Sequence, residues 1–370
     1  MRELYDYLIV GAGLAGSTIA ERLASTRGAS VLIVDRREHV AGNAHDDVAI
    51  DGIRYHRYGP HIFHTNSQAV VAYLSLFTTW RPYEHRVLAR VGERLVPIPI
   101  NRTTINSLYG CDLDEAGVAR FLAARAEHFP RIETSEQTIR ARVGKELYET
   151  FFRGYTRKQW GLDPARLDAA VCGRIPTRTN DDDRYFSDRF QAIPTDGYTA
   201  MVRRMLDRPS IDVALGIDFQ TLSREKIARR IIFTGPIDEY YDFRYGRLPY
   251  RSLRFTFETY DRPLYQSAAC VNEPGEHVPY TRTTEYKYLT GQSASNTLVS
   301  REYPSAEGDP FYPIPCAESR ALYRRYEALA KAESHVTFAG RLGQYKYFNM
   351  DQVVASALAK ADSLAIEAVA

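Results

Sequence analysis

The chain opens with a short apolar run, a cluster of glycines, and then apolar positions at helical spacing. Residues 7–24 (YLIVGAGLAGSTIAERLA) therefore predict a β-strand, a glycine turn and an amphipathic helix, and residues 30–35 (SVLIVD) predict a second strand. At the far end, residues 335–361 (HVTFAGRLGQYKYFNMDQVVASALAKA) predict a strand, a glycine loop and a helix that begins between Asn349 and Gln352. Similar strand and helix units thus lie at opposite ends of the chain.

Between these ends the pattern changes twice. From about Thr103 to Asp168 it is helical, as in residues 112–129 and 134–160. From Arg244 to Tyr303, three tyrosine-rich stretches separated by turn residues predict an antiparallel sheet; they are residues 250–260, 277–289 and 295–304.

A basic segment ends the helical region. Residues 171–194 combine prolines and aspartates with Arg174, Arg178, Arg184 and Arg189. This is the composition of a loop rather than a helix, and such a loop can serve as a lid.

Composition limits the compartment and the partners. The 370 residues contain 48 Lys and Arg against 46 Asp and Glu, so no global field attracts nucleic acid or an anionic membrane. The first residues, MRELYDYLIV, are too short and too charged for a signal peptide or a membrane span. The cysteines, Cys111, Cys172, Cys270 and Cys316, form no CxxC pair, which argues against zinc and disulfides. We expect a cytoplasmic protein without membrane insertion or a nucleic-acid partner.

The first glycines have the spacing of a dinucleotide-binding fingerprint. Gly11 would make the tight turn, Gly13 would let the backbone approach a pyrophosphate, and Gly16 would let helix and strand pack closely. Asp35 ends the second strand and would accept a hydrogen bond from an adenosine ribose. The fingerprint alone fits NAD or FAD.

Two further features favour FAD over NAD. Gly42 and Asn43 form a second loop soon after the second strand, suited to reach along a longer dinucleotide. The helix expected near Asn349 could direct free N–H groups and its positive dipole end at a flavin ring. A terminal strand and helix that merely complete the sheet would give the same pattern.

These elements predict an α/β protein with a Rossmann-like FAD-binding domain, an inserted helical domain and an antiparallel β-sheet domain. We assign residues 1–80, 196–236 and 335–370 to the discontinuous FAD-binding domain, residues 102–195 to the helical domain with a mobile loop at 166–178, and residues 81–101 and 237–334 to the sheet domain.

Two histidines three residues apart, His61 and His64, could be metal ligands, acid–base groups or supports for a bound group. No third metal ligand is evident beside them, and we predict no metal site. The sequence also lacks HExxH, a P-loop, a nucleophile elbow and paired metal carboxylates. We therefore expect the chemistry to belong to a bound flavin.

Several stretches, spread in order along the whole chain, resemble the UDP-galactopyranose mutase family of flavoenzymes. They are VGAGLAG, GPHIFHTN, GYTRKQWG, RIPTRTNDDDRYFSDRFQAIP, FTGPIDEYYDFRYG, LPYRSLRFTFE, VPYTRTTEYK and GRLGQYKYFNMDQV. As a set these motifs are highly specific.

The resemblance implies a nucleotide-sugar site. Phe151, Tyr155 and Trp160 match residues that hold the uracil and ribose, and Arg174 and Arg282 match arginines that clamp the diphosphate and act in catalysis. The further substrate contacts implied are Tyr185, Arg251, Asn272, Tyr312, Tyr347 and His85.

The resemblance also implies that His61 contacts the flavin, influences it and acts in catalysis, while His64 is structural. The implied FAD-binding residues are Gly11, Gly13, Leu14, Ala15, Gly16, Asp35, Arg36, Gly42, Asn43, His61, Ile62, Arg341, Asn349, Met350 and Asp351. The implied reaction interconverts UDP-galactopyranose and UDP-galactofuranose by attack of N5 of the reduced flavin on the anomeric carbon, without net redox. The product would feed cell-surface polysaccharide synthesis.

Departures from the family pattern concern the sugar pocket. Phe348 and Asn349 replace a tyrosine and an aspartate, and Thr283, Thr284 and Tyr286 also differ from the common pattern. A related sugar nucleotide such as dTDP-fucopyranose is therefore the first alternative substrate. An FAD oxidoreductase or amine oxidase of the same fold, and a flavin protein without turnover, are further alternatives. A homodimer is possible.

Overall fold

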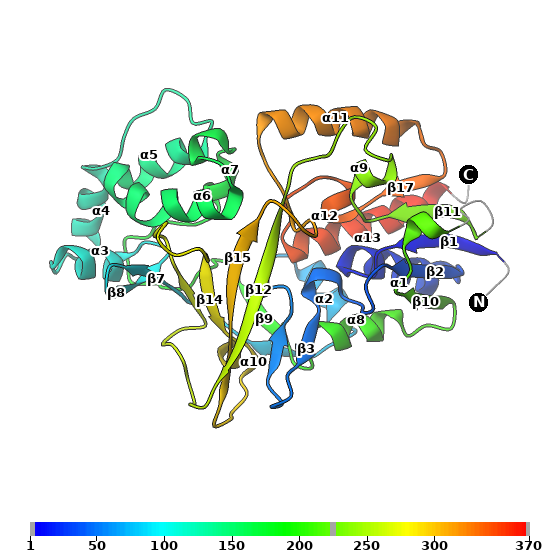
Figure 1. The fold of residues 1–370 in the computed structure, drawn as a ribbon, viewed down its shortest axis with the longest axis horizontal. Helices are drawn as coiled ribbons and strands as arrows, with labels where there is room; N and C mark the ends of the chain where they lie inside the picture. The colour runs from blue at the N-terminus through cyan, green and yellow to red at the C-terminus, as the bar shows by residue number, and fades with distance from the viewer. Residues whose placement is uncertain (1–3, 223–226, 368–370) are drawn as a thin grey trace.

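The computed structural model describes residues 4–222 and 227–367, and its elements form three parts (Figure 1). The first part is a five-stranded parallel sheet in the order β10-β2-β1-β11-β17. Its strands are β1 (Tyr5–Val10), β2 (Val31–Asp35), β10 (Ile211–Leu215), β11 (Ala228–Phe233) and β17 (Val336–Phe338). The predicted strands at both ends of the chain are confirmed, and they belong to one sheet.

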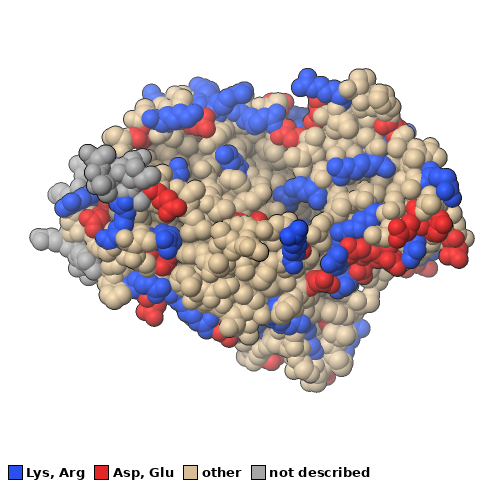
Figure 2. All heavy atoms as spheres, turned by 180° about the vertical axis from the view of Figure 1, so that it is seen from behind, with Lys and Arg blue, Asp and Glu red and all other residues tan. Residues whose placement is uncertain are grey.

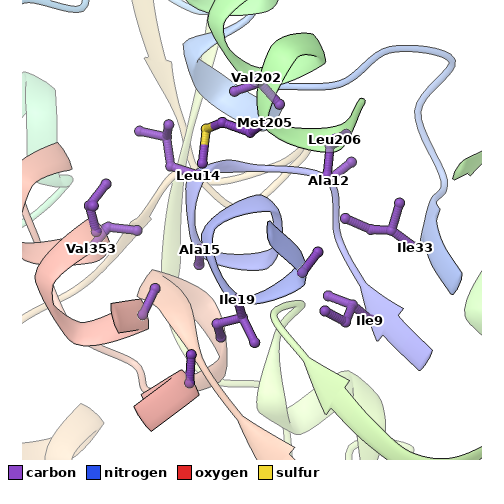
Figure 3. Close-up of a cluster of buried hydrophobic side chains, with 14 of the residues drawn as sticks. Ile9, Ala12, Leu14, Ala15, Ile19, Ile33, Val202, Met205, Leu206 and Val353 are labelled. Atoms are coloured by element: carbon purple, nitrogen blue, oxygen red, sulfur yellow. The ribbon is translucent and has the colours of Figure 1, made fainter. Parts of the chain in front are cut away.

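Side chains alternate between the two faces of this sheet. Tyr7 and Ile9 of β1 pack in the core on one face, while Leu8 between them packs in the core on the other. The first face is covered by α1 (Leu14–Arg27), α8 (Tyr198–Leu206) and α13 (Met350–Glu367), which meet in the core drawn in Figure 3. The start of α13 at Met350 confirms the predicted helix start. The second face is covered by α9 (Ile237–Tyr240) and α11 (Ala317–Ala332).

The second part is a seven-stranded sheet in the order β16-β12-β15-β14-β13-β7-β8. Its strands are β7 (Val87–Val91), β8 (Arg94–Ile98), β12 (Tyr250–Tyr260), β13 (Cys270–Asn272), β14 (Arg282–Glu285), β15 (Thr297–Ser305) and β16 (Tyr312–Pro313). The predicted antiparallel sheet is confirmed, except that β13 and β7 pair in parallel.

The third part is helical and lies at the end of the molecule away from the parallel sheet (Figure 1). It contains α3 (Arg102–Tyr109), α4 (Glu115–Ala123), α5 (Ser135–Tyr148), a π-helical turn (Glu149–Arg153), α6 (Gly154–Trp160) and α7 (Ala170–Gly173). Capping boxes at Asn101 and Thr134 fix the starts of α3 and α5.

The structure differs from the sequence prediction in two places. Residues 286–290, predicted as strand, form helix α10 (Tyr286–Thr290), because a helical turn lets Tyr286 and Leu289 bury side chains in one cluster. The end of the predicted loop, Phe190–Pro194, is strand β9, which pairs with β5 (Phe63–Thr65) and β6 (Trp80–Pro82). Long-range pairing decides that strand, and no local signal marks it.

The remaining short elements join these parts; they are β3 (Asp46–Val48), β4 (Arg54–His56), α2 (Gln68–Leu74) and α12 (Gly340–Gly343), with 3-10 turns at Gly42–Ala44, Pro164–Arg166 and Phe219–Thr221. On the face shown in Figure 2, basic and acidic side chains are interspersed. Within residues 4–222 and 227–367, no helix is both long and apolar enough to cross a bilayer.

Candidate active site

A cavity lies at the carboxyl ends of β1 and β11, above the start of α1. We call it the dinucleotide cavity. Gly13 is the N-cap of α1 and has no side-chain cap, so the first N–H groups of the helix can serve a ligand. The predicted residues that line the cavity are Gly11, Gly13, Leu14, Ala15, Asp35, Arg36, Gly42, Asn43, His61, Arg341 and Met350.

The glycines act sterically as the fingerprint predicts. Gly11 has φ +105°, and a Cβ there would lie 2.0 Å from Thr234 Oγ1. A Cβ on Gly16 would lie 1.9 Å from the Gly11 carbonyl oxygen, so only glycine lets the helix pack this closely. Gly13 faces Gly42, with 3.7 Å between its would-be Cβ and the Gly42 Cα. Side chains at these two positions would fill the cradle that a pyrophosphate needs.

Asp35 closes the base of this cradle. Its Oδ2 accepts a hydrogen bond from the Ala12 backbone N–H at 2.8 Å, and its Oδ1 accepts from Arg37 N–H at 2.9 Å. A carboxylate has lone pairs left after two such bonds, and Asp35 also lines the cavity, so it can still accept from a ribose hydroxyl. The residues present therefore fit an adenine dinucleotide.

Four of the predicted cofactor residues lie outside the lining. Gly16 packs under the glycine turn, and Ile62 belongs to a separate hydrophobic cluster. The Asn349 backbone N–H donates to Gln352 Oε1 at 2.9 Å, and Asp351 Oδ2 accepts from Thr65 Oγ1 at 2.8 Å. Direct cofactor contact by these residues stays a prediction.

Sequence reasoning missed part of the lining: Arg37, Ala41, Ile217, Asp218, Phe219, Gln220, Thr234, Gly235, Pro236, Glu239, Pro310, Phe311 and Gly340. The stretch Thr234–Pro236 had a usable signal, because it is a glycine loop directly after the apolar strand β11. Residues 217–220 had none, since they reach the cavity only because β10 lies beside β2.

The histidine loop lies against the cavity through His61. The His61 backbone N–H donates to His56 Nδ1 at 2.9 Å, and His61 Nδ1 lies 2.8 Å from the Gly59 carbonyl oxygen. Burial lowers the His61 pKa to about 3, so the ring is neutral at neutral pH. His64 turns elsewhere: its Nδ1 lies 2.7 Å from Asp188 Oδ2 and its ring stacks on Phe186 at 3.7 Å.

Over the part of the chain that the structure describes, no three His, Cys, Asp or Glu side chains are grouped as a metal ion requires.

Next to the cavity, arginine and aromatic side chains from four elements converge. The Arg174 guanidinium lies 4.1 Å from the Tyr347 ring centroid, and its Nη2 lies 3.3 Å from the Tyr347 hydroxyl. The ring centroid of Tyr347 lies 5.3 Å from that of Trp160 and 5.4 Å from that of Tyr312. Arg341, which lines the cavity, lies 5.4 Å from the Tyr312 ring centroid and joins the two sites.

Arg282 extends this group from the sheet. Its Nη2 donates to the Tyr155 hydroxyl at 2.6 Å, and its Nε lies 3.5 Å from Glu302 Oε2. That buried Nε has no hydrogen-bond partner among the described residues, so it remains available to an anion. We call the whole set the arginine–aromatic cluster: Tyr155, Trp160, Arg174, Tyr185, Arg282, Glu302, Tyr312 and Tyr347.

Glu302 was missed by sequence reasoning. It is 4% exposed on β15, directly opposite Arg282 of β14 in the strand register. Its position in an alternating strand gave no sign that the carboxylate would face an arginine.

Other predicted substrate residues have additional partners. Arg251 donates from Nε to the Gln159 carbonyl at 2.9 Å and from Nη2 to the Lys158 carbonyl at 3.1 Å, which satisfies the end of α6. Phe151 is 4% exposed in the core of the helical part. Asn272 pairs with Arg282 in the register of β13 and β14.

His85 lies behind the cluster and is only 3% exposed. Its Nδ1 lies 3.2 Å from the Tyr83 hydroxyl, and burial lowers its pKa to about 3. Tyr286, expected at the sugar pocket, lies in the core: its hydroxyl donates to the His56 carbonyl at 3.0 Å and lies 2.9 Å from Ser300 Oγ. The expectation for Tyr286 is therefore wrong, because the helical turn α10 directs it inward.

Comparison with known proteins identifies the family. A family model described as UDP-galactopyranose mutase matches residues 150–347, and one described as an NAD(P)-binding Rossmann-like domain matches residues 9–77. A probable UDP-galactopyranose mutase of Klebsiella pneumoniae is 41% identical over 96% of this chain and 94% of its own length. A dTDP-fucopyranose mutase of Escherichia coli is 36% identical over 95% of this chain and 96% of its own length.

Solved structures share the fold at low sequence identity. A reduced UDP-galactopyranose mutase has a TM-score of 0.77 and 15% identity over 99% of this chain and 95% of its own. A putrescine oxidase variant has a TM-score of 0.63 and 14% identity over 98% of this chain and 99% of its own. The family-model match and the curated relatives decide between these two: the chain belongs to the UDP-galactopyranose mutase family of isomerases.

Proposed function

We propose that this protein is an FAD-dependent mutase that interconverts the pyranose and furanose forms of UDP-galactose without net redox. The observation that carries the proposal is the arginine–aromatic cluster beside the dinucleotide cavity. Arg174 and Arg282 come from separate elements, Arg174 contacts Tyr347 and Arg282 contacts Tyr155, and the charges of both arginines act on the pKa of Tyr185 in the cluster. A nucleoside diphosphate offers two negative phosphates and a planar base, which match these groups.

The cofactor would occupy the dinucleotide cavity, with its pyrophosphate at Gly13 and Gly42 and its adenosine ribose at Asp35. When bound and reduced, FAD supplies a nucleophilic nitrogen at N5, the chemistry that exchange at an anomeric carbon requires. The neutral His61 ring and the N-terminus of α13 would adjoin the flavin, and neither adds a positive side-chain charge that would compete for the diphosphate.

The arginines serve the leaving group. As the sugar–phosphate bond breaks, negative charge develops on the diphosphate, and Arg174 and Arg282 would stabilise that charge and retain UDP for the return step. Glu302 holds Arg282 from the opposite strand, so the guanidinium need not reorganise as the charge appears. Tyr155 and Trp160 would hold the uracil and ribose.

A second substrate, dTDP-fucopyranose, has independent support from the 36% identical dTDP-fucopyranose mutase. Both sugars require the same diphosphate clamp, so the cluster does not discriminate between them. The replaced residues Phe348 and Asn349 directly precede α13, and the Phe348 carbonyl accepts a hydrogen bond at 2.6 Å from Nη2 of Arg341, which lines the cavity. Contact of these two residues with the sugar would distinguish the two substrates.

The test is to load the protein with FAD, reduce it with dithionite and measure exchange of UDP-galactofuranose and of the dTDP-fucose pair. We expect many turnovers per reducing equivalent with the UDP sugar, and little exchange by the oxidised protein. Exchange that stops after one turnover per electron pair, or that proceeds equally without reduction, would reject the proposal. Faster exchange of the dTDP sugar would reassign the substrate and keep the reaction.

A further inference from the structure

Lys158 of α6 places its ammonium group inside a cage of backbone carbonyl groups. Its Nζ lies 2.6 Å from the carbonyl oxygen of Glu273, 2.7 Å from that of Gly275, 3.1 Å from that of Val278 and 2.9 Å from that of Tyr280. An ammonium has three protons to donate, so four acceptors share them. All four belong to one turn, residues 273–280.

This turn connects two strands that carry predicted substrate residues. It begins directly after Asn272, the last residue of β13, and leads into β14, which begins at Arg282. Figure 1 shows this connection running beside α6, the helix that carries Tyr155 and Trp160. The turn therefore leads into the strand that carries Arg282 and packs against the helix that carries Tyr155 and Trp160.

Two other contacts hold the same junction. A Cβ on Gly154 would lie 2.4 Å from the Pro274 carbonyl oxygen, so α6 and the turn approach as closely as glycine permits. Arg157 Nη1 lies 3.3 Å from Glu276 Oε1 at the exposed rim. Lys158 is the part of this junction that satisfies the polar groups inside it.

Short chain segments connect the Lys158 cage to the arginine–aromatic cluster. Tyr155 and Lys158 are three residues apart on α6, and Arg282 is two residues beyond Tyr280 of the cage. Across the same junction, Arg282 Nη2 donates to the Tyr155 hydroxyl at 2.6 Å. Without the ammonium, four carbonyl oxygens would face each other unpaired, and the turn would have to open toward water.

We propose that Lys158 is a positioning residue that fixes Arg282 relative to Tyr155 and Trp160, and so sets the affinity of the site for a nucleoside diphosphate. This inference rests on the proposed function, because it takes Arg282 as part of the diphosphate clamp. It adds a residue that touches neither substrate nor cofactor.

The chain contains a matched control. Lys287 of α10 also donates to three backbone carbonyls, among them Pro263 at 2.8 Å and Asn296 at 2.9 Å, and it is 7% exposed. Its acceptors lie in the loops between β12 and β13 and between α10 and β15, and no residue of the arginine–aromatic cluster lies in these loops. Loss of either ammonium costs stability, but only loss of Lys158 should affect the clamp.

The experiment compares Lys158→Met with Lys287→Met in the FAD-loaded protein. Lys158→Met should raise the Kd for UDP about tenfold and raise KM similarly. The value of kcat should fall less than about threefold, because Arg282 is misplaced rather than removed. Lys287→Met should lower the melting temperature but leave the Kd for UDP within about twofold of the wild type. Amide hydrogen exchange, measured without nucleotide, should speed up in residues 273–280 of Lys158→Met only.

A double-variant cycle gives the sharper result. If Lys158 acts through Arg282, then Lys158→Met combined with Arg282→Ala should bind UDP within about twofold of Arg282→Ala alone. Losses that multiply in the double variant would overturn the proposal, and so would an unchanged Kd for UDP in Lys158→Met. If Lys158→Met does not fold, Lys158→Gln, whose amide can donate two of the hydrogen bonds, should still raise the Kd about threefold. A wild type that binds no UDP would reject the proposed function instead, while the hydrogen-exchange comparison would still test the cage.

Discussion

The dinucleotide cavity and the arginine–aromatic cluster lie side by side but are built in opposite ways. The cavity is built around a glycine turn, where Gly11 and Gly13 line it and Gly16 packs beneath, and all three act by lacking side chains. The cluster is made of long side chains, and its members come from residues 155 to 347. The central turn of the cavity is encoded in a short segment, while every contact within the cluster depends on the tertiary fold.

The difference predicts different responses to mutation. In the cavity, adding one methyl group should be disruptive, because the glycine backbone has no room for it. In the cluster, the addition of one methyl group should have little effect on activity. Removal of a charged side chain that faces a buried partner should reduce activity strongly. Substitutions in both regions, in order of decreasing expected effect, test that contrast.

Arg282→Ala should give the largest loss. It removes a guanidinium from the proposed clamp and leaves the buried Glu302 carboxylate without its arginine partner. We expect a loss of about 2–5 kcal/mol in transition-state stabilisation, measured from kcat/KM, and Arg174→Ala should fall in the same range. Arg189→Ala is the control: its exposed side chain lies on the same basic segment outside the cluster, and it should lose much less. Equal, small losses for all three variants would show that the clamp lies elsewhere.

Gly16→Ala should mainly affect FAD binding. The added Cβ would collide with the Gly11 carbonyl, and relieving that collision costs about 1–3 kcal/mol and moves the turn that receives the pyrophosphate. The measurement is the ratio of flavin to protein absorbance after purification. Gly28→Ala at the other end of α1 is the control, because its φ is also positive, at +64°, but nothing lies within 4 Å. It should cost about 1 kcal/mol of stability and retain FAD. Equal flavin loss in both variants would contradict the steric argument.

Acid should destabilise both regions through buried histidines. Burial lowers the pKa of His56, behind the cavity, and of His85, behind the cluster, to about 3, below the ordinary value of 6.5. Between these pH values the unfolded chain therefore binds more protons than the folded chain. The contribution of the two histidines to the free energy of unfolding should be fully present above about pH 6.5 and should decrease as the pH falls toward 3.

The variant His85→Gln tests this pH dependence. Between pH 7 and pH 5 it should lose on the order of 1–2 kcal/mol less unfolding free energy than the wild type, measured by urea denaturation. His128→Gln, at an exposed position, should behave like the wild type. A parallel pH dependence in all three proteins would show that folding does not lower the pKa of His85.

The smallest expected effect concerns the predicted mobile loop, residues 166–178. Arg174 is exposed, and its guanidinium contacts the cluster through the ring and hydroxyl of Tyr347. If UDP draws Arg174 over the phosphates, saturating UDP should slow proteolysis in this segment about threefold. The Arg174→Ala variant should show no such protection. Cleavage at one rate with and without UDP in the wild type would indicate a fixed loop.

The sequence by itself determined the dinucleotide half of the molecule. The spacing of Gly11, Gly13 and Gly16, the strand before them and Asp35 after them all act within one contiguous unit, so local pattern and physical function coincide. The helix that begins at Met350 was predictable for the same reason. Identification of the cluster residues by number came from a family resemblance spread along the chain, since no local property of Arg282 or Tyr347 marks a ligand site.

Only the tertiary structure decided which side chains meet. Glu302 faces Arg282 because β15 pairs with β14 in one particular register, and a shift of one residue would turn it to the other face. Tyr286 entered the core because α10 replaced a predicted strand, and Lys158 closed the 273–280 turn because α6 packs on it at a glycine contact. These outcomes depend on contacts between residues far apart in the chain, where strand register and helix packing override local propensity.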